Sequence, residues 1–248
     1  MFRIIPRLDI KNNFLIKGIN FEGLKKIGTI NEILPKIFKS NPDEIILLDC
    51  LSSLYERKDL FIHIKKYLDK VFVPLIGGGG IKSLTDSDRF FNNGFDKILI
   101  NTGCIKNSNL LKKISKKYGS QSICLNIEAK KINNATWEPL FNYGRERSYY
   151  EIYDYMNKAI DYGCGEICIT SVDNEGELKG LDWDLINYLD GKFPVNLLIG
   201  GGLKDKNEVL KVAKDTSFSG VTFSSLIYDN FQIIDQMKKH LLSNGINV

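Results

Sequence analysis

VPLIGGGGIKSLTD (Val73–Asp86) and VNLLIGGGLKDKNE (Val195–Glu208) are two copies of one pattern within a chain of 248 residues. In each copy a short apolar run leads into consecutive glycines, and a stretch with the period of a helix follows. The copies lie about 120 residues apart, which is half of the chain. This spacing predicts that the protein is built from two similar halves.

Three further pairs of segments repeat at the same spacing. DEIILLDCLSS resembles CGEICITSVDNEG, FDKILINTGCIKN resembles FSGVTFSSLIYDN, and PRLDIK stands opposite LNIEAK. These segments are Asp43–Ser53 and Cys164–Gly176, Phe95–Asn107 and Phe218–Asn230, and Pro6–Lys11 and Leu125–Lys130. Because their order is the same in both halves, the repeat covers the whole chain rather than one motif.

Short apolar runs alternate along the chain with longer segments of helical period. Such runs, without polar alternation, are typical of parallel strands that are buried on both faces. We expect strands over Arg3–Asp9, Glu44–Asp49, Val73–Ile76, Lys97–Asn101, Ser122–Ile127, Glu166–Ser171, Asn196–Ile199 and Gly220–Phe223. We expect helices over Ile30–Ser40, Lys58–Lys70, Thr85–Asn93, Ser108–Tyr118, Tyr149–Tyr162, Asp182–Tyr188, Asp205–Asp215 and Asn230–Ser243.

Eight strand–helix units in series form either a closed barrel or a doubly wound sheet. The two-fold repeat favours the barrel, because two sets of four units close naturally on each other. The length of 248 residues also matches the usual length of about 250. We therefore predict an α/β fold, a (β/α)8 TIM barrel, as a single domain over residues 1–248 with half-barrels at about 1–120 and 121–248.

The composition is that of an ordinary globular protein, with 43% apolar residues, 26% charged residues and a net charge of +4. The lysines are spread over amphipathic segments, which argues against a nucleic-acid surface. No apolar run approaches the length of about 18 residues that a membrane span needs. We expect no signal peptide and a cytoplasmic location.

The cysteines and histidines offer little for metal or cofactor chemistry. No CxxC pair occurs, and we expect buried, reduced thiols. Cys164 and Cys168 lack a nearby histidine or third cysteine, so we expect no metal site, and no cofactor is implied. His63 and His240 lie in helical patterns, which argues against a histidine-based triad. The five cysteines are Cys50, Cys104, Cys124, Cys164 and Cys168.

Glycine runs and short polar pairs end four of the expected strands. Active sites of barrels lie at the carboxyl ends of the strands. Strands three and seven end in Gly77–Gly80 and Gly200–Gly202, and strands four and eight end in Asn101–Thr102 and Ser224–Ser225. Glycine lets backbone N–H groups approach an anion closely. One such run indicates only a tight turn, but the same arrangement in both halves predicts two phosphate sites and a ligand with a phosphate at each end.

Asp9 ends the first strand and Glu128 ends the fifth, on opposite sides of the barrel axis. Two carboxylates that flank a substrate can act as general acid and general base. A single acid at a strand end could equally hold a loop, but the symmetry of this pair favours catalysis. Asp49 and Asp173 also lie at or just past strand ends, where they hold loops or assist.

Four charged residues occupy the starts of strands, at the opposite end of the barrel. Two acids and two bases on alternating strands meet near the axis. There they either form an ion-pair ring that stabilises the fold or plug the barrel. The four residues are Arg3, Glu44, Lys97 and Glu166.

Lys130–Ser148 is an irregular insertion after the fifth strand, and it therefore lies on the catalytic face. It contains Trp137, Phe141, Tyr143 and the charged run GRER (Gly144–Arg147). A loop of this length is usually functional or forms a small hairpin over the mouth. The sequence leaves its role open.

Taken together, the chain resembles the cyclase subunit of imidazole glycerol phosphate synthase, a barrel family of histidine biosynthesis. The phosphoribosyl isomerase barrel of the same pathway has a similar glycine pattern but lacks the first block of the resemblance. The resemblance runs from end to end through RIIPRLDIKNNFLIKGINFEGL, GGGIKS, DKILINT, GSQSICLNIEAK and GEICITSVDNEG, which are Arg3–Leu24, Gly78–Ser83, Asp96–Thr102, Gly119–Lys130 and Gly165–Gly176.

The resemblance implies that a glutaminase partner docks at the bottom of the barrel and supplies ammonia through its core. The ammonia meets a bis-phosphorylated ribulosyl substrate at the top, which gives imidazole glycerol phosphate and an aminoimidazole carboxamide ribotide. Asp9 and Glu128 match the catalytic carboxylates, and the four charges at the bottom match an ammonia gate. The implied substrate-binding residues are Lys17, on a mobile loop after strand one, and Gly80, Asn101, Thr102, Gly176, Gly202, Ser224 and Ser225.

The sequence departs from the family at three places. Glu128 stands where the family has aspartate, and a carboxylate displaced by about 1 Å can cost on the order of 10²-fold in rate. DNEGE (Asp173–Glu177) replaces DRDGT, so Glu177 opposes a phosphate unless it turns outward. LSSLYERKD (Leu51–Asp59) replaces ASSEGRD. We therefore expect preserved ammonia delivery and altered acceptor chemistry.

Three functions remain open. The first is the cyclase reaction. The second is that of a paralogue, as found in surface-polysaccharide gene clusters, which conducts ammonia to a third protein, an amidotransferase that makes an amidino sugar. The third is an isomerase that acts alone, and the four charges at the bottom argue against it.

Overall fold

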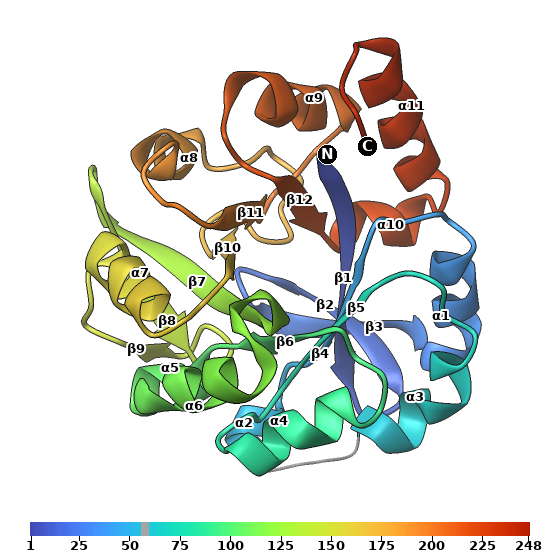
Figure 1. Cartoon of the computed structure of the whole chain (residues 1–248). Helices are drawn as coiled ribbons and strands as arrows, with labels where there is room; N and C mark the ends of the chain where they lie inside the picture. The colour runs from blue at the N-terminus through green and yellow to red at the C-terminus, as the bar shows by residue number, and fades with distance from the viewer. Residues whose placement is uncertain (56–59) are drawn as a thin grey trace.

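The computed structural model describes residues 1–55 and 60–248. Within these residues, parallel strands form a central barrel and helices surround it (Figure 1). The barrel strands are β1 (Arg3–Lys11), β4 (Ile45–Asp49), β5 (Leu75–Gly78), β6 (Lys97–Ile100), β7 (Ile123–Asn133), β10 (Glu166–Ser171), β11 (Asn196–Gly200) and β12 (Gly220–Phe223).

The strands pair in the order β1, β4, β5, β6, β7, β10, β11, β12 and back to β1. Paired residues can be followed from strand to strand around the barrel. From Asp9 on β1, the pairing through β4, β5 and β6 reaches Cys124 on β7. From Asn126 on β7, the pairing through β10, β11 and β12 returns to Arg3 on β1. A full circuit is therefore displaced along the strands by about eight residues, which is the shear of a closed eight-stranded barrel. The predicted (β/α)8 TIM barrel is confirmed.

Amphipathic helices cover the outside of the barrel. In α1 (Ile30–Phe38) one row of apolar side chains is buried, and a capping box between Thr29 and Glu32 fixes the first turn. The other helical elements are α2 (Ser52–Tyr55), α3 (Leu60–Leu68), α4 (Leu84–Phe91), α5 (Thr102–Lys106), α6 (Asn109–Tyr118), η1 (Ser120–Ser122), α7 (Ile152–Asp161), α8 (Trp183–Leu189), α9 (Lys206–Asp215), α10 (Ser225–Asp229) and α11 (Ile233–Ser243).

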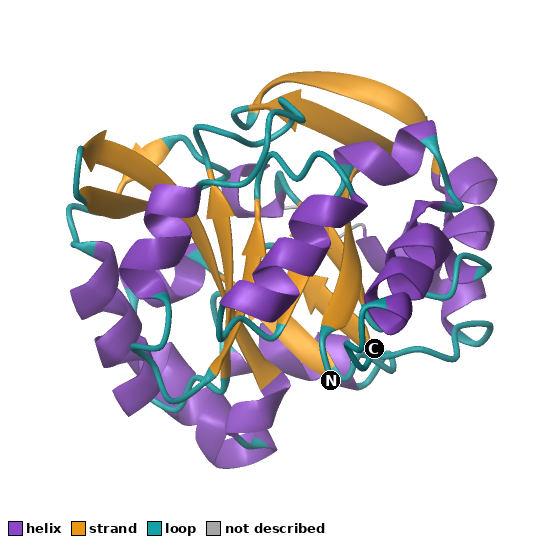
Figure 2. Cartoon of the chain, turned by 90° about the horizontal axis from the view of Figure 1, so that it is seen from above, coloured by secondary structure: helices purple, strands orange, loops and turns teal. Residues whose placement is uncertain are grey.

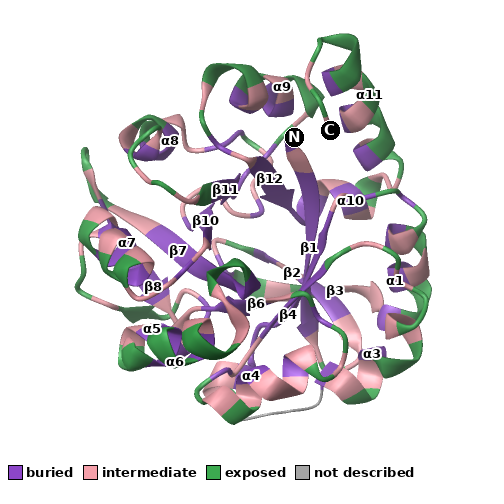
Figure 3. Ribbon diagram, viewed as in Figure 1, coloured by how far each residue is buried: buried purple, intermediate pink, exposed green. Residues whose placement is uncertain are grey.

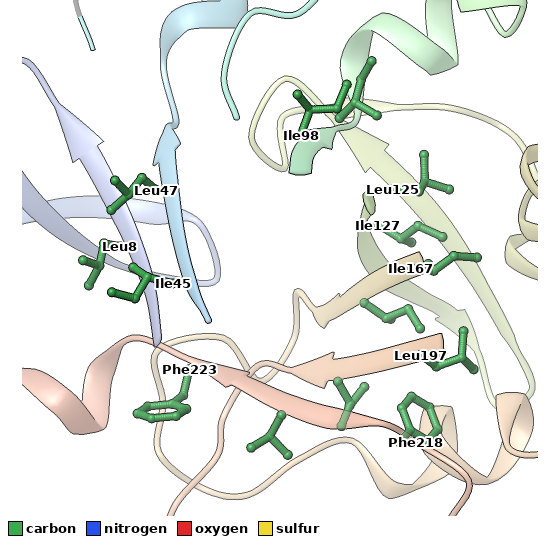
Figure 4. Close-up of a cluster of buried hydrophobic side chains, with 14 of the residues drawn as sticks. Leu8, Ile45, Leu47, Ile98, Leu125, Ile127, Ile167, Leu197, Phe218 and Phe223 are labelled. Carbon is green, nitrogen blue, oxygen red and sulfur yellow. The ribbon is translucent and has the colours of Figure 1, made fainter. Parts of the chain in front are cut away.

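The barrel strands bury side chains on both faces, as their apolar runs predict. Along β1, Ile4 and Leu8 pack outward against the helices, whereas Ile5 points into the barrel. Figure 4 shows part of the outer cluster, with Leu8, Ile45 and other strand residues on the same side of the sheet. The helices are buried on the side that faces the barrel and exposed on the other (Figure 3).

Two antiparallel hairpins extend the sheet at one end of the barrel, and both termini lie towards the other end (Figure 2). β2 (Phe14–Ile19) and β3 (Glu22–Thr29) form the first hairpin. In the second, β8 (Thr136–Phe141) pairs with the extended end of β7 and with β9 (Glu146–Arg147). The insertion thus forms a hairpin, which is one of the two alternatives that its length suggested.

Several expected boundaries differ from the structure for identifiable reasons. The strand expected over Val73–Ile76 begins only at Leu75, because Pro74 has no N–H to give to the ladder. The fifth strand runs on to Asn133 because it pairs there with β8. The helix expected over Lys58–Lys70 includes residues outside the described part, and its described portion is α3.

Candidate active site

Pockets open at the carboxyl ends of the barrel strands in both halves of the described chain, and two of them contain the expected phosphate-binding residues. The first is lined by Gly80, Asn101 and Thr102, together with Glu128 and Tyr143. The structure therefore brings the three residues of one expected phosphate grip to a single pocket, beside one of the two expected catalytic carboxylates.

The second pocket lies at the corresponding place in the other half of the chain. It is lined by Gly176, Gly202, Ser224 and Ser225, together with Glu175. The two pockets thus follow the internal repeat, with a glycine turn and a polar strand end in each.

The glycine turns form a close wall in both pockets. Gly80 and Gly202 have left-handed φ angles of +65° and +87°. A Cβ atom on Gly80 would stand 2.4 Å from the Ser52 Oγ, and one on Gly202 would stand 2.4 Å from the Gly180 carbonyl oxygen. Only glycine fits both demands, and its bare backbone can come close to a ligand.

The polar side chains of the two pockets are engaged differently. Asn101 donates a 3.0 Å hydrogen bond to a carbonyl of β8, and Thr102 accepts one of 3.1 Å from a backbone N–H just after β8. In the second pocket, the Ser224 Oγ donates to Glu175 at 3.4 Å. The buried Ser225 Oγ has no hydrogen-bond partner within the described part of the chain, so this hydroxyl is available to a ligand.

Asp9 is buried at the end of β1, with both carboxylate oxygens engaged. The Arg7 Nε donates to one oxygen at 2.9 Å, and the Tyr143 hydroxyl donates to the other at 2.7 Å. The sequence pointed to Tyr143 only as part of the insertion, and it did not point to Arg7. Arg7 could have been found, because it precedes Asp9 by two residues and side chains two apart on a strand share a face.

Glu128 is buried across the barrel from Asp9, at 2% exposure. It accepts hydrogen bonds of 2.7 Å from the Gly144 N–H and 3.3 Å from the Asn126 Nδ2. Burial raises the pKa of the Glu128 carboxyl to about 7, although the nearby Arg7 guanidinium draws this pKa down. Glu128 can therefore both give and take a proton near neutral pH.

Glu175 is a third carboxyl at the mouth, and its sequence pattern predicted no role for it. Enclosure of the group raises the pKa of Glu175 to about 7, while the positive charges of Arg7 and Lys17 oppose this rise. Lys17 thus acts on the second pocket through its charge. It lies on β2 of a hairpin, where a mobile loop was expected. The position of Glu175 directly before Gly176 was the available signal.

The two hairpins meet over the mouth. The rings of Phe21, between β2 and β3, and Tyr143, after β8, pack edge to face with their centroids 4.9 Å apart. Both residues have left-handed φ angles, 63° for Phe21 and 59° for Tyr143. For non-glycine residues this conformation costs on the order of 1–3 kcal/mol each and persists where surrounding contacts enforce it. The contact therefore closes the mouth between the pockets.

The remaining acids at this end hold loops. Asp173 forms an ion pair with Lys130 and accepts a 2.9 Å hydrogen bond from the Lys131 N–H, which anchors the insertion. The Glu177 carboxylate lies 2.7 Å from the Lys179 ammonium. Glu177 is not among the described residues that line the second pocket.

The four charged residues at the bottom form a closed ring, here called the basal ring. Each acid contacts both bases: Lys97 lies 3.1 Å from Glu44 and 2.8 Å from Glu166, and Arg3 lies 3.0 Å from Glu44 and 2.6 Å from Glu166. The ring spans strands from both halves of the barrel. The ring lies at the lower end of the barrel interior, which is here called the bore.

All five cysteines are buried and free. No group of three or more metal-ligating side chains occurs in residues 1–55 and 60–248. In the same residues, no helix has the length and apolar character needed to cross a membrane.

The family model described as histidine biosynthesis protein matches residues 3–231. The chain is similar to proteins named imidazole glycerol phosphate synthase subunit HisF. It is 38% identical to that of Legionella pneumophila over 201 residues, covering 81% of this chain and 95% of the relative. It is 33% identical to that of Lactococcus lactis subsp. cremoris over 245 residues, covering 98% and 95%. With that of Streptococcus gordonii it shares 30% over 246 residues, covering 99% and 98%.

Proposed function

The chain belongs to the histidine biosynthesis protein family, and on that basis we propose that it is the cyclase subunit of imidazole glycerol phosphate synthase. In the proposed reaction it combines ammonia with a bis-phosphorylated ribulosyl aminoimidazole precursor and forms imidazole glycerol phosphate. The reaction is that of a lyase and needs no cofactor.

The observation that carries this proposal is the pair of pockets related by the repeat, with Asp9 and Glu128 between their strands. A substrate with a phosphate at each end fits two glycine-walled pockets in one mouth. Its central atoms would then lie over the barrel axis, where the two carboxylates point.

The two carboxylates suit proton transfer during ring closure. Glu128, with its pKa raised to about 7, is present in both protonation states near neutral pH. Asp9 forms an ion pair with Arg7, and in the proposed reaction it is the general base. The pair supplies an acid on one side of the substrate and a base on the other.

Binding requires the hairpins to separate. The Tyr143 hydroxyl donates a hydrogen bond to Asp9, and the Tyr143 ring fills the space between the pockets together with Phe21. A substrate that spans both pockets displaces this contact, and closure afterwards would exclude water from the reacting atoms.

A glutaminase subunit is the proposed partner, docked at the basal ring. Ammonia released there enters the bore when the ring opens, and an isomerase acting alone would have no use for this ring. A cytoplasmic location is part of the proposal, and the five free, buried cysteines suit a reducing compartment.

The direct experiment is to incubate the purified chain with the ribulosyl precursor and ammonium salts and to identify the product. We expect imidazole glycerol phosphate from the unmodified chain and none from Asp9→Asn. A folded sample that gives no product at high ammonium concentration contradicts the proposal.

One observation favours a second candidate, the ammonia conduit for an amidotransferase in amidino-sugar synthesis. Asp9 has no unengaged oxygen, and the side chains of Asn101 and Thr102 are tied to the insertion. A mouth closed in this way suits a barrel that passes ammonia on without binding a bis-phosphate.

Complementation separates the two candidates. The cyclase restores growth to a histidine auxotroph that lacks its own cyclase, and Asp9→Asn does not. The conduit fails to restore growth, binds a glutaminase and a third protein together, and tolerates Asp9→Asn. Absence of a third partner in a pull-down from the native source counts against the conduit.

A further inference from the structure

The inward-facing residues of β1 are stacked along the barrel axis. Side chains alternate along a strand, so Arg3 of the basal ring, Ile5, Arg7 and Asp9 follow one another from the bottom to the mouth. Arg7 lies where an apolar bore meets the mouth. Inside the barrel this bore is packed with the buried apolar side chains of Ile5, Ile46, Ile76, Leu99, Cys124, Cys168 and Leu198.

The Arg7 side chain reaches across this bore. Its Nη1 donates a 3.1 Å hydrogen bond to the Thr170 Oγ1 on β10, and its Nε is held by Asp9. The residue is 5% exposed. Its Nη2 has no hydrogen-bond partner among the residues that the structure describes. A buried donor without a partner costs about 1–3 kcal/mol, so the Nη2 indicates a molecule that accepts a hydrogen bond there.

Asn126 is the counterpart of Arg7 in the other half of the repeat, just as Glu128 is the counterpart of Asp9. The ladder links Asn126 to Arg3. Opposite strands of the barrel are staggered by about four residues, which brings Arg7 to the height of Asn126. The two side chains therefore face the bore at one level.

Asn126 also carries an unused polar atom. Its Nδ2 donates to Glu128 at 3.3 Å, and the residue is 3% exposed. Its Oδ1 has no hydrogen-bond partner in the described part of the chain, and it is not bonded to Arg7. A donor and an acceptor, both buried and both unused, thus stand at the top of the bore.

A neutral ammonia molecule has the complementary hydrogen-bonding groups. Its lone pair accepts from the Arg7 Nη2, and one of its N–H groups donates to the Asn126 Oδ1. An ammonium ion has no lone pair, and the guanidinium repels it. The pair therefore selects the form of ammonia that can act as a nucleophile.

We propose that Arg7 and Asn126 form a receiving site for neutral ammonia at the top of the bore, directly below Asp9 and Glu128. The inference rests on the proposed function, in which ammonia crosses the barrel. Thr170 positions Arg7 over the bore without touching the substrate. The site retains ammonia from the glutaminase until the acceptor is bound.

The test uses the complex of the full chain with its glutaminase. It measures product formed per glutamine hydrolysed, and separately the turnover with ammonium salts. Thr170→Val removes the hydroxyl that anchors Arg7, and Thr170→Ser keeps it as the matched control. We expect Thr170→Val to lower product per glutamine by up to about tenfold, the effect of one lost hydrogen bond, with the ammonium-driven rate nearly unchanged. Thr170→Ser should behave like the unmodified chain.

Asn126→Leu is the second variant, in case Thr170→Val does not fold. It removes the acceptor together with the Nδ2 donor to Glu128, so both readouts should fall, product per glutamine more than the ammonium-driven rate. Unchanged coupling in the folded variants overturns the site, which then holds only water. An equal loss with glutamine and with ammonium salts also overturns it, because the residues then act on catalysis or folding. No product from the unmodified chain with either source overturns the proposed function instead.

Discussion

Arg7 influences the charge of the whole mouth from one position. Its guanidinium pairs with Asp9 and lowers the pKa values of Glu128 and Glu175, which burial has raised to about 7. Without this buried cation, both glutamates would be held more strongly in their neutral forms. The proposed proton-transfer chemistry of the site thus depends on a residue two positions before Asp9.

Glu128→Gln tests the protonation of this site. A pKa of about 7, against 4.5 ordinarily, means that the folded chain binds the proton more tightly than the unfolded chain. As the pH rises from about 4.5 to 7, the unfolded chain gives up this proton and the folded chain keeps it. The free energy of unfolding of the unmodified protein therefore falls over this range. We expect the free energy of unfolding of Glu128→Gln, relative to the unmodified protein, to rise by about 2–3 kcal/mol between pH 4.5 and 8. Urea titrations at each pH measure this difference in the free energy of unfolding. A difference that does not change with pH contradicts a raised pKa for Glu128.

Gly202→Ala tests the second phosphate pocket, with Gly191→Ala as the matched control. Both glycines have left-handed φ angles, +87° and +68°, so both variants carry about 1–2 kcal/mol of backbone strain. A Cβ at Gly191 meets nothing within 4 Å, whereas one at Gly202 stands 2.4 Å from a carbonyl oxygen. We expect Gly202→Ala to be the less stable variant in thermal unfolding.

Calorimetric titration with inorganic phosphate completes this comparison. Gly202→Ala should lose binding at the second pocket, and Gly191→Ala should keep it. Equal phosphate affinity in the two variants would show that this pocket is not a phosphate site.

At the scale of elements, the insertion hairpin fixes both carboxylates. Its turn supplies the Tyr143 hydroxyl to Asp9 and the Gly144 N–H to Glu128. The hairpin is anchored away from the mouth as well, because the Trp137 Nε1 donates to Asp182 at 3.2 Å. The base of the hairpin is therefore held in place, and in the proposed function only its tip would move to admit a substrate.

Tyr143→Phe should loosen this tip. The change deletes a hydrogen bond to a charged, buried partner, which contributes about 1.5–3 kcal/mol. We expect a loss of this order in the free energy of unfolding and faster hydrogen exchange of the amides in β8. Exchange rates equal to those of the unmodified chain would mean that the hydroxyl does not hold the hairpin closed.

The elements that the sequence predicts are those whose patterns arise from burial. The barrel strands are apolar on both faces and the helices on one, so both stand out by period. The β2–β3 hairpin was not predicted, because residues such as Lys25 and Lys26 are both exposed and do not alternate with buried residues as in a typical strand. The roles of Arg7 and Tyr143 depend on contacts between segments distant in the chain, which a repeat between halves does not reveal.

At the scale of the whole molecule, the barrel has two closed ends, and buried apolar side chains pack the bore between them. The basal ring closes the bottom through four ion pairs, and the two hairpins close the top. The repeat explains the pockets at the top, but the ring joins residues from both halves. From the sequence alone, the four charged residues could form either a ring that stabilises the fold or a plug of the barrel, and nothing in the sequence decided between the two.

Lys97→Met tests the ring, because it leaves Glu44 and Glu166 close together without one of their two cations. Breaking a buried ion pair typically costs about 3–5 kcal/mol, and we expect a loss of that order in urea unfolding. Lys117→Met is the control, since the Lys117–Asp88 pair is exposed and such pairs contribute about 0–1 kcal/mol. Similar effects in the two variants would mean that the ring does not act as a buried network.

In the proposed function, this barrel performs acid–base chemistry on a bis-phosphorylated substrate with ammonia. The most direct measurement is the rate at which the unmodified chain and Asp9→Asn form imidazole glycerol phosphate from the ribulosyl precursor and ammonium salts. We expect turnover by the unmodified chain and a loss of about 10²–10⁴-fold in Asp9→Asn. Absence of product from the folded, unmodified chain, or equal rates in the two proteins, would contradict it.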